Sequence, residues 1–200
     1  MLKALKLFWK ESWLLIAASF FFGLLLAVTY TAWNPKIEQN KTAKFEKQVS
    51  DVVSGAKLDA PIDGDFVISD KISTKVYPVK SQTGEKLGFA FAAQGPGYDI
   101  IELVIVVDAN CENYLGYGVL VCNETPGFGD KMKYPFFKDQ FTNITAAELT
   151  LVKEGDPADK EDSKIVAISG ATISSQGVVN IFNTYIGIIR EQLIKRGLIK

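Results

Sequence analysis

Residues 164–196 read KIVAISGATISSQGVVNIFNTYIGIIREQLIKR, and this stretch decides the fold. The short apolar run Lys164–Ile168 is typical of a strand, and an apolar-periodic helix follows over roughly Ser174–Arg196. One face of that helix gathers Val178, Ile181, Phe182, Tyr185, Ile189 and Leu193. Gly197 is a typical residue to end it. A strand, a tight turn and a long amphipathic helix are therefore predicted at the end of the chain.

The turn between strand and helix consists of Ser169, Gly170, Ala171 and Thr172. It presents the Thr172 hydroxyl at a helix N-terminus, where backbone N–H groups and the helix dipole favour a phosphate. Small residues let a bulky phosphate ligand come close to the backbone. The alternative is an ordinary helix N-cap, a position at which Ser and Thr are preferred. Both interpretations stay open on this motif alone.

Upstream, residues 12–35 carry no charge, and this apolar segment predicts a transmembrane helix over 12–33. Interfacial aromatics lie near its two ends at Trp9, Trp13, Tyr30 and Trp33. A cleaved signal peptide would have a shorter apolar region and a small-x-small cleavage site, so a retained anchor is favoured. Lysines flank both ends, and their count does not decide the orientation. The short head and the large C-terminal part favour a domain outside the cytoplasm.

We expect four regions: a cytoplasmic N-terminus (1–11), the transmembrane helix (12–33), a connecting helix (34–56) and a domain (57–200). Pro35 is a plausible first residue of the connecting helix and Gly55 a plausible stop. A stripe at helical spacing along that helix, Ile37, Lys41, Phe45, Val49 and Val52/Val53, can pack on the domain.

Most of the domain reads as short strands. Residues 100–108 and 115–122 are rich in β-branched side chains around a polar turn at 109–113, which predicts a hairpin. Further strands are predicted over 73–78, 87–92 and 150–153, with Gly84 in a turn, a chain break at Gly95-Pro96-Gly97 and an acidic loop over 154–163. The predicted class is α+β, mostly antiparallel, with helices at both ends.

Composition excludes several kinds of function. A net charge of −1 argues against nucleic-acid binding, and the absence of His removes the commonest metal ligand and general base. Cys111 falls in the hairpin turn and Cys122 at the far end of the returning strand, roughly 25 Å away at ~3.3 Å per residue. That distance is too long for a disulfide, so both are expected to be free thiols. We expect neither a metal site nor a catalytic residue.

A second motif, Glu-Thr-Pro-Gly-Phe-Gly-Asp-Lys at 124–131, follows the end of a strand. Its two glycines around one Phe let the backbone pass close to a flat ligand; the alternative is a simple Pro-Gly turn. The two motifs, about 45 residues apart and in this order, form a specific signal. The candidate ligand contacts here are Glu124, Thr125, Gly127, Phe128, Gly129 and Lys131. Four aromatic residues could also stack on a ligand: Tyr98, Tyr134, Phe136 and Phe137. Aromatic side chains are more often part of the core, so this is a weaker expectation.

The membrane anchor, Gly-Pro-Gly-Tyr at 95–98 and the motifs at 124–131 and 169–172 make the chain resemble the G subunit of the Rnf electron-transport complex. The resemblance covers essentially the whole chain, and a close relative is the C subunit of the sodium-translocating NADH:quinone reductase. It implies FMN joined through a phosphoester to Thr172 by a separate flavin transferase that uses FAD. Val166 stands where the family motif usually carries Asp.

The function that the resemblance implies is a single-pass flavoprotein subunit of the cytoplasmic membrane. It would relay electrons within an ion-translocating ferredoxin/NAD oxidoreductase, would not be catalytic alone, and would carry its FMN domain outside the cytoplasm. Its expected partners are the other subunits of the complex, the flavin transferase and membrane lipid. Two alternatives remain: the C subunit of the quinone reductase, and a membrane-anchored scaffold whose Ser-Gly-Ala-Thr is only a helix cap.

Overall fold

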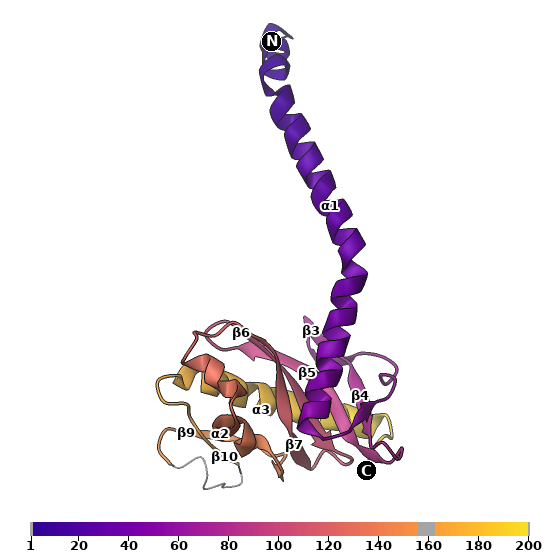
Figure 1. Cartoon of the computed structure of the whole chain (residues 1–200), viewed down its shortest axis with the longest axis vertical. Coiled ribbons are helices and arrows are strands. Elements are labelled where there is room, and N and C mark those ends of the chain that lie inside the picture. The colour runs from indigo at the N-terminus through magenta and orange to yellow at the C-terminus, as the bar shows by residue number, and fades with distance from the viewer. Residues whose placement is uncertain (1, 156–162, 200) are drawn as a thin grey trace. The chain divides into compact units, whose positions relative to one another are not determined.

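The structure, a computed structural model, describes residues 2–155 and 163–199. The chain divides into two compact units, Met1–Ala43 and Lys44–Lys200. One long helix, α1 (Leu2–Val52), runs through the first unit and enters the second (Figure 1).

In the first unit, α1 contains a segment that is long and apolar enough to cross a membrane. The helix does not begin afresh at Pro35, because this residue lies inside α1. A helical Pro lacks the N–H that would bond to the carbonyl four residues earlier, here that of Thr31. Thr31 itself donates its hydroxyl to the Ala27 carbonyl at 2.8 Å. The expected connecting helix is therefore continuous with the helix before it.

The second unit is built on a six-stranded sheet in which every neighbouring pair is antiparallel. In spatial order its strands are β1 (Lys57–Leu58), β4 (Val76–Lys80), β5 (Lys86–Pro96), β6 (Ile100–Asp108), β7 (Asn113–Cys122) and β8 (Ile144–Thr145). The predicted hairpin is β6–β7. The α+β class and the mostly antiparallel sheet are confirmed.

Shorter elements surround this sheet. They are the hairpin β2 (Phe66–Ser69) and β3 (Ile72–Thr74), the parallel pair β9 (Thr150–Val152) and β10 (Lys164–Val166), and the turns η1 (Gly129–Lys133), α2 (Pro135–Lys138) and η2 (Asp139–Phe141). Residues 156–162 of the predicted acidic loop lie outside the described residues. The chain then forms α3 (Thr172–Lys195), two residues earlier than predicted at its start.

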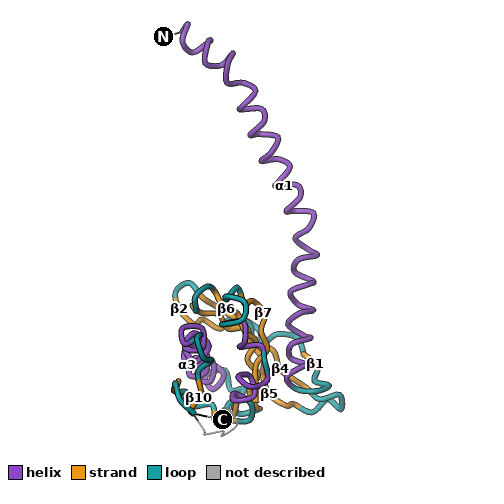
Figure 2. Tube along the Cα trace, turned by 60° about the vertical axis from the view of Figure 1, so that its left-hand side comes forward, coloured by secondary structure: helices purple, strands orange, loops and turns teal. Residues whose placement is uncertain are grey.

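The sheet is covered on both faces, as β6 shows most clearly. Alternate residues of β6, Ile101, Leu103, Ile105 and Val107, belong to a large core that includes the predicted apolar face of α3. Val104 and Val106 point the other way, into a smaller core with Val49 of α1. Figure 2 shows α3 and the last turns of α1 on opposite sides of the strands. Continuous apolar sequence in β6 follows from burial on both faces.

Glycine in β7 lets the end of α1 approach the sheet. A Cβ at Gly118 would lie 2.7 Å from the Cβ of Gln48, which is closer than packed atoms come. The Gln48 Oε1 accepts the Val119 N–H at 3.2 Å. The second compact unit starts at Lys44, inside the predicted connecting helix 34–56. Phe45 and Val49 of the predicted stripe pack on the sheet.

Helix α3 ends in a Schellman motif. Gly197 has φ +69, its N–H bonds to the Ile194 carbonyl at 2.9 Å, and the Leu198 N–H bonds to the Leu193 carbonyl at 3.0 Å. The prediction that Gly197 ends the helix is confirmed. The Schellman motif lies at the opposite end of α3 from the turn that begins the helix, and it ends the helix independently of that turn.

The chain break expected at Gly95-Pro96-Gly97 lies after Pro96, the last residue of β5. β5 continues through Gly95 and Pro96, which pair with Ile101 and Ile100 of β6. β4 leaves β5 at Phe91, so the far side of β5 is no longer paired with β4 at Pro96. A proline is tolerated where its missing N–H is not needed for a ladder.

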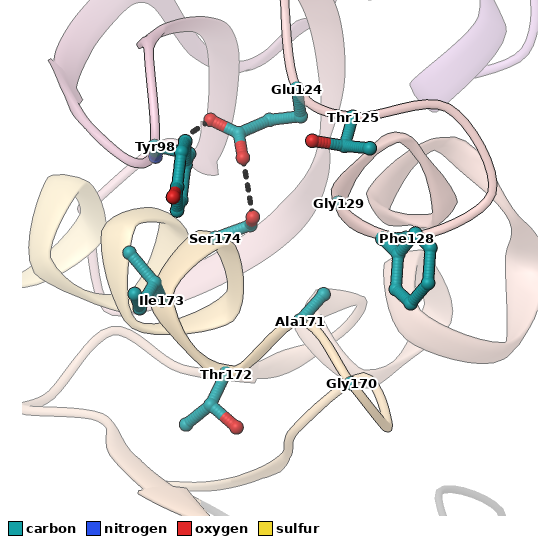
Figure 3. A pocket seen from close by; sticks show the side chains of 10 residues that line it. All are labelled: Tyr98, Glu124, Thr125, Phe128, Gly129, Gly170, Ala171, Thr172, Ile173 and Ser174. Atoms are coloured by element: carbon teal, nitrogen blue, oxygen red, sulfur yellow. Dashed lines mark hydrogen bonds between the residues drawn. The ribbon is translucent and has the colours of Figure 1, made fainter.

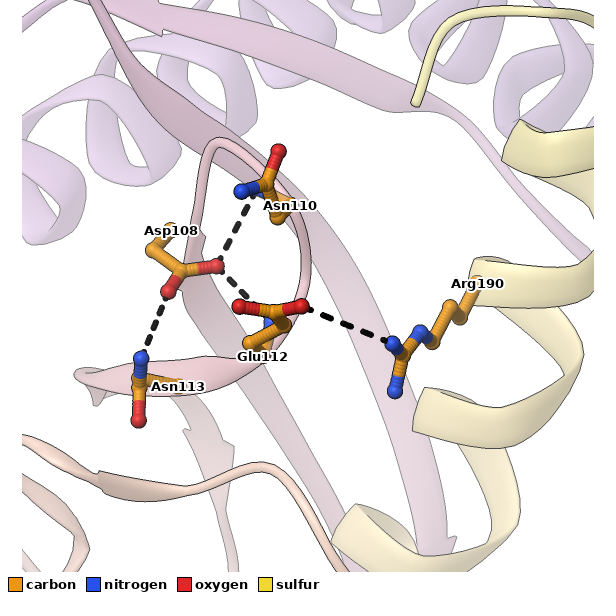
Figure 4. Close-up of polar contacts among 5 residues, drawn as sticks. All are labelled: Asp108, Asn110, Glu112, Asn113 and Arg190. Atoms are coloured by element: carbon orange, nitrogen blue, oxygen red, sulfur yellow. Dashed lines mark hydrogen bonds and ion pairs between the residues drawn. The ribbon is translucent and has the colours of Figure 1, made fainter. Parts of the chain in front are cut away.

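The hairpin turn between β6 and β7 is held by one carboxylate, shown in Figure 4. Asp108 Oδ1 accepts the N–H groups of Asn110 and Glu112 at 3.2 and 2.8 Å. Glu112 pairs with Arg190 of α3 at 3.9 Å.

Cys111 in this turn is a buried free thiol whose pKa burial raises to about 12, so it is protonated at neutral pH. Cys122 is also free and lies at the other end of β7.

Candidate functional site

A cavity of about 520 Å³ opens at the N-terminus of α3 (Figure 3). Three segments far apart in sequence form it: the loop after β5, the segment after β7, and the turn that leads into α3. The lining residues are Tyr98, Glu124, Thr125, Phe128, Gly129, Gly170, Ala171, Thr172, Ile173 and Ser174. Both sequence motifs therefore meet in one place.

The two motifs contain the same kind of turn. In Thr125–Phe128 the Phe128 N–H bonds to the Thr125 carbonyl at 3.1 Å, with Pro126 second and Gly127 (φ +80) third. Such a positive φ at the third position is typical of a type II turn and favours glycine. In 168–171 the equivalent bond is 2.9 Å long and Gly170 has φ +78.

The two turns lie against each other. A Cβ at Gly170 would come within 3.3 Å of the Phe128 ring, so glycine keeps that contact open. Gly127 differs from Gly170, because a Cβ there would meet nothing within 4 Å. Gly127 is therefore needed for its backbone conformation and not for close approach.

No side chain caps the N-terminus of α3. The N-cap residue is Ala171, and neither Ser169 nor Thr172 makes the capping hydrogen bond. Ser175 serves the preceding turn instead: its hydroxyl accepts the Ile168 N–H at 3.0 Å and donates to the Ala171 carbonyl at 2.9 Å. The helix-cap interpretation of the motif is thus not supported, and the first N–H groups of α3 have no side chain bonded to them. Such groups favour an anion.

Behind this helix end lies a buried carboxylate, that of Glu124, whose residue is 5% exposed. Its Oε1 accepts the N–H groups of Tyr98 and Asp99 at 2.9 and 3.1 Å. Its Oε2 accepts the hydroxyl of Ser174, which is 4% exposed. One carboxylate therefore ties the loop after β5, the segment after β7 and the first turn of α3 together.

Glycines make room for this contact. A Cβ at Gly129 would lie 2.8 Å from the Glu124 Cβ, and one at Gly97 would lie 2.6 Å from Glu124 Oε1. On α3, a Cβ at Gly177 would lie 2.7 Å from the Pro96 carbonyl oxygen. The three segments pack at backbone distance around Glu124, and no larger residue fits at these positions without a shift.

The mouth of the cavity is apolar. Tyr98 is 78% exposed, Ile173 59% and Phe128 52%. Thr172 is also exposed, and Figure 3 shows its side chain on the opposite side of the site from the Glu124 carboxylate. An exposed hydroxyl, uncapped helix N–H groups and an aromatic rim are thus available to one ligand.

Of the residues proposed from the sequence, the cavity brings together Glu124, Thr125, Phe128, Gly129, Gly170, Ala171 and Thr172, with Tyr98. Ser169, Gly127, Lys131, Tyr134 and Phe136 are not part of its lining. Phe137 is fully buried in the large core, in contact with Phe141. Sequence reasoning missed Ile173 and Ser174, although both belong to the first turn of a helix whose start was identified.

Comparisons with known proteins agree with this geometry. The FMN-binding domain family matches residues 97–187, a range that contains the whole lining of the cavity. The G subunit of the ion-translocating oxidoreductase complex of Methanosarcina acetivorans is 27% identical over 170 residues, covering 84% of this chain and 87% of that protein. The G subunit of the proton-translocating ferredoxin:NAD(+) oxidoreductase complex of Clostridium ljungdahlii is 29% identical over 162 residues, covering 80% and 79%.

The fold is also similar to a solved structure. NqrC of Shewanella oneidensis superimposes with a TM-score of 0.56 at 22% identity, covering 70% of this chain and 69% of that one. The resemblance predicted from the motifs is confirmed: residues 97–187 match the FMN-binding domain family, and the chain is similar over most of its length to the G subunits of ion-translocating oxidoreductase complexes.

Proposed function

We propose that this chain is a membrane-anchored flavoprotein subunit that relays electrons within an Rnf-type ion-translocating oxidoreductase complex. The observation that carries the proposal is the meeting of both motifs in one cavity, inside the segment that matches the FMN-binding domain. The similarity to two G subunits supports the assignment to a multi-subunit redox complex.

The residues of the cavity fit FMN. A volume of about 520 Å³ lies within the range of small-molecule sites. The flavin ring is flat and largely apolar, and the exposed faces of Tyr98, Phe128 and Ile173 offer a matching surface. The phosphate fits the uncapped N–H groups at the start of α3, next to the Thr172 hydroxyl.

We propose further that Thr172 holds the FMN covalently. With FAD as donor, the Thr172 oxygen forms a bond to the flavin-side phosphorus, the bond between the two phosphates breaks, and AMP leaves with the displaced oxygen. The Thr172 proton is released to a base of the flavin transferase. Such a phosphoester leaves the ring free to pack at the mouth of the cavity.

Bound FMN supplies the redox chemistry, since a flavin accepts and donates electrons by itself. The chain binds the phosphate, orients the ring and limits access of water. Among the described residues no group of three or more Cys, Asp or Glu side chains could hold a metal ion. In this proposal the chain is an electron carrier whose donor and acceptor are other subunits, which the similarity to subunits of redox complexes supports.

Isolation of the complex tests this function. The full chain, tagged at its C-terminus and purified from its own membranes in mild detergent, should bring several other redox subunits with it. The flavin absorbance of the tagged chain should bleach when the physiological donor is added. Companions typical of a sodium-translocating quinone reductase would favour the alternative, the C subunit of that enzyme. A tagged chain that is alone and colourless would contradict both and favour the scaffold.

The anchor and its orientation are the second part of the proposal. The candidate membrane segment of α1 supports a single-pass anchor in contact with lipid, and we place the FMN domain on the extracytoplasmic side. Alkaline phosphatase, which is active only outside the cytoplasm, should be active when fused after the last residue. Activity of a cytoplasmic reporter at the same position would overturn the orientation, while the flavin assignment would stand.

A further inference from the structure

Glu124 is a buried carboxylate in the cavity wall, and none of the salt bridges found among the described residues involves it. All three of its hydrogen-bond partners are donors: two backbone N–H groups and the Ser174 hydroxyl. Hydrogen bonds donated to a carboxylate stabilise its charged form, and Glu124 receives three of them. The site is built to keep a negative charge at this position.

No Lys or Arg is among the described residues that line the cavity. Among the described residues, the groups bonded to Glu124 are two backbone N–H groups and the hydroxyl of Ser174, which belongs to the N-terminal end of α3. A phosphoester at Thr172 would add a second negative charge at the same helix end. Next to protein atoms such charges act more strongly than they do in bulk water.

We propose that Glu124 sets the reduction potential of the flavin held in this cavity. A fixed negative charge disfavours the arrival of an electron, so Glu124 lowers the potential and makes the bound flavin a stronger reductant. The proposal rests on the proposed function and extends it, because it assigns an electrostatic role to a residue that would otherwise be a structural tie. It needs no contact between carboxylate and ring, since Coulomb interaction acts across the cavity.

The first test removes the charge and keeps the shape. In Glu124→Gln the amide oxygen can accept the N–H groups of Tyr98 and Asp99, and the amide nitrogen can donate to Ser174. The full-length variant is produced with the flavin transferase, and the potential of its bound flavin is measured by spectroelectrochemical titration. We expect a shift to more positive potential than that of the wild type, at equal flavin content.

The second test keeps the charge and removes a donor. Ser174→Ala leaves the Glu124 carboxylate with two partners, so at alkaline pH, where a carboxylate stays ionised, its charge is less neutralised and the potential should move to more negative values. Alanine is a good helix residue, so this variant is expected to fold. Opposite shifts in the two variants distinguish an electrostatic role from a structural one, because general loosening of the site would not reverse sign between them.

A matched control removes a carboxylate elsewhere. Glu112→Gln changes the net charge by the same amount in the hairpin turn of Figure 4, at the opposite end of β7 and about 30 Å away by strand length. Its potential should equal that of the wild type, because exposed charges at that distance are screened.

Each outcome decides the proposal. Unchanged potentials in Glu124→Gln and Ser174→Ala, with flavin bound, would overturn the inference and leave the proposed function intact. If Glu124→Gln does not fold, as judged by circular dichroism, the sign of the Ser174→Ala shift decides alone. A wild-type chain that holds no flavin after production with the transferase would overturn both proposals.

Discussion

Thr172→Val should abolish covalent flavin attachment while leaving the domain folded. Valine has nearly the shape of threonine, and Thr172 is exposed at the first position of α3, so little packing changes. What is lost is the only atom of this side chain that can form the phosphoester. After denaturation and gel filtration, the wild-type chain should retain flavin absorbance and the variant should have none, a loss of essentially the whole signal.

Thr172→Ser is the matched control, because it keeps the hydroxyl and removes only a methyl group. It should retain flavin after denaturation, with slower loading if the methyl group helps to orient the hydroxyl. Mass spectrometry of the tryptic peptide that contains residues 165–190 should locate the added FMN. Flavin that survives denaturation in Thr172→Val would mean that another hydroxyl, such as that of Ser169, is the attachment point.

The largest effect on stability is expected for Phe182→Ala. Phe182 is fully buried on the sheet side of α3, with ring centroids 4.8 Å from Tyr114, 5.6 Å from Tyr117 and 4.6 Å from Phe141. Truncation leaves a cavity in the middle of this aromatic cluster. Phe→Ala changes in cores cost about 3–5 kcal/mol, and urea unfolding of the second unit within the detergent-solubilised full chain should show a loss of that size.

Ile194→Ala on the same helix serves as its control. Ile194 is 46% exposed and lies outside the cavity, so its truncation should change the free energy of unfolding by less than about 0.5 kcal/mol. Equal losses in the two variants would mean that α3 is not anchored to the sheet through Phe182. If the loss is specific to Phe182, flavin loading should also fall, because α3 carries Thr172 and Ser174 into the cavity.

Local patterns predicted those parts of the fold that depend on neighbouring residues. The β6–β7 hairpin, the apolar face of α3 and its end at Gly197 follow from periodicity and turn residues. Pro35 was expected to begin a helix and lies inside α1, whereas Pro96, expected in a chain break, is the last residue of β5. At Pro96 the reason is tertiary: β4 has already left the strand, so no N–H is required there.

In the candidate site, too, local sequence predicted some features, while others depend on tertiary contacts. Turn chemistry in two short motifs was sufficient to select most of the residues that line the cavity. The hydrogen bond from Ser174 to Glu124 joins residues 50 positions apart, and no local sequence pattern predicts such a contact. The sequence does not distinguish Ser174 from the other hydroxyl residues at the start of the helix. Only the folded chain shows that Ser174 is buried against a carboxylate.

The assembly of the cavity from three distant segments also fixes the order of events during biosynthesis. The N-terminal helix leaves the ribosome first, whereas the cavity is completed only when α3, which ends at Lys195, has been made. Until then the loop after β5 and the segment after β7 have no helix end to close against. Under the proposed function, loading of FMN follows translation, and a chain that stalls before α3 is made is expected to lack the site for it.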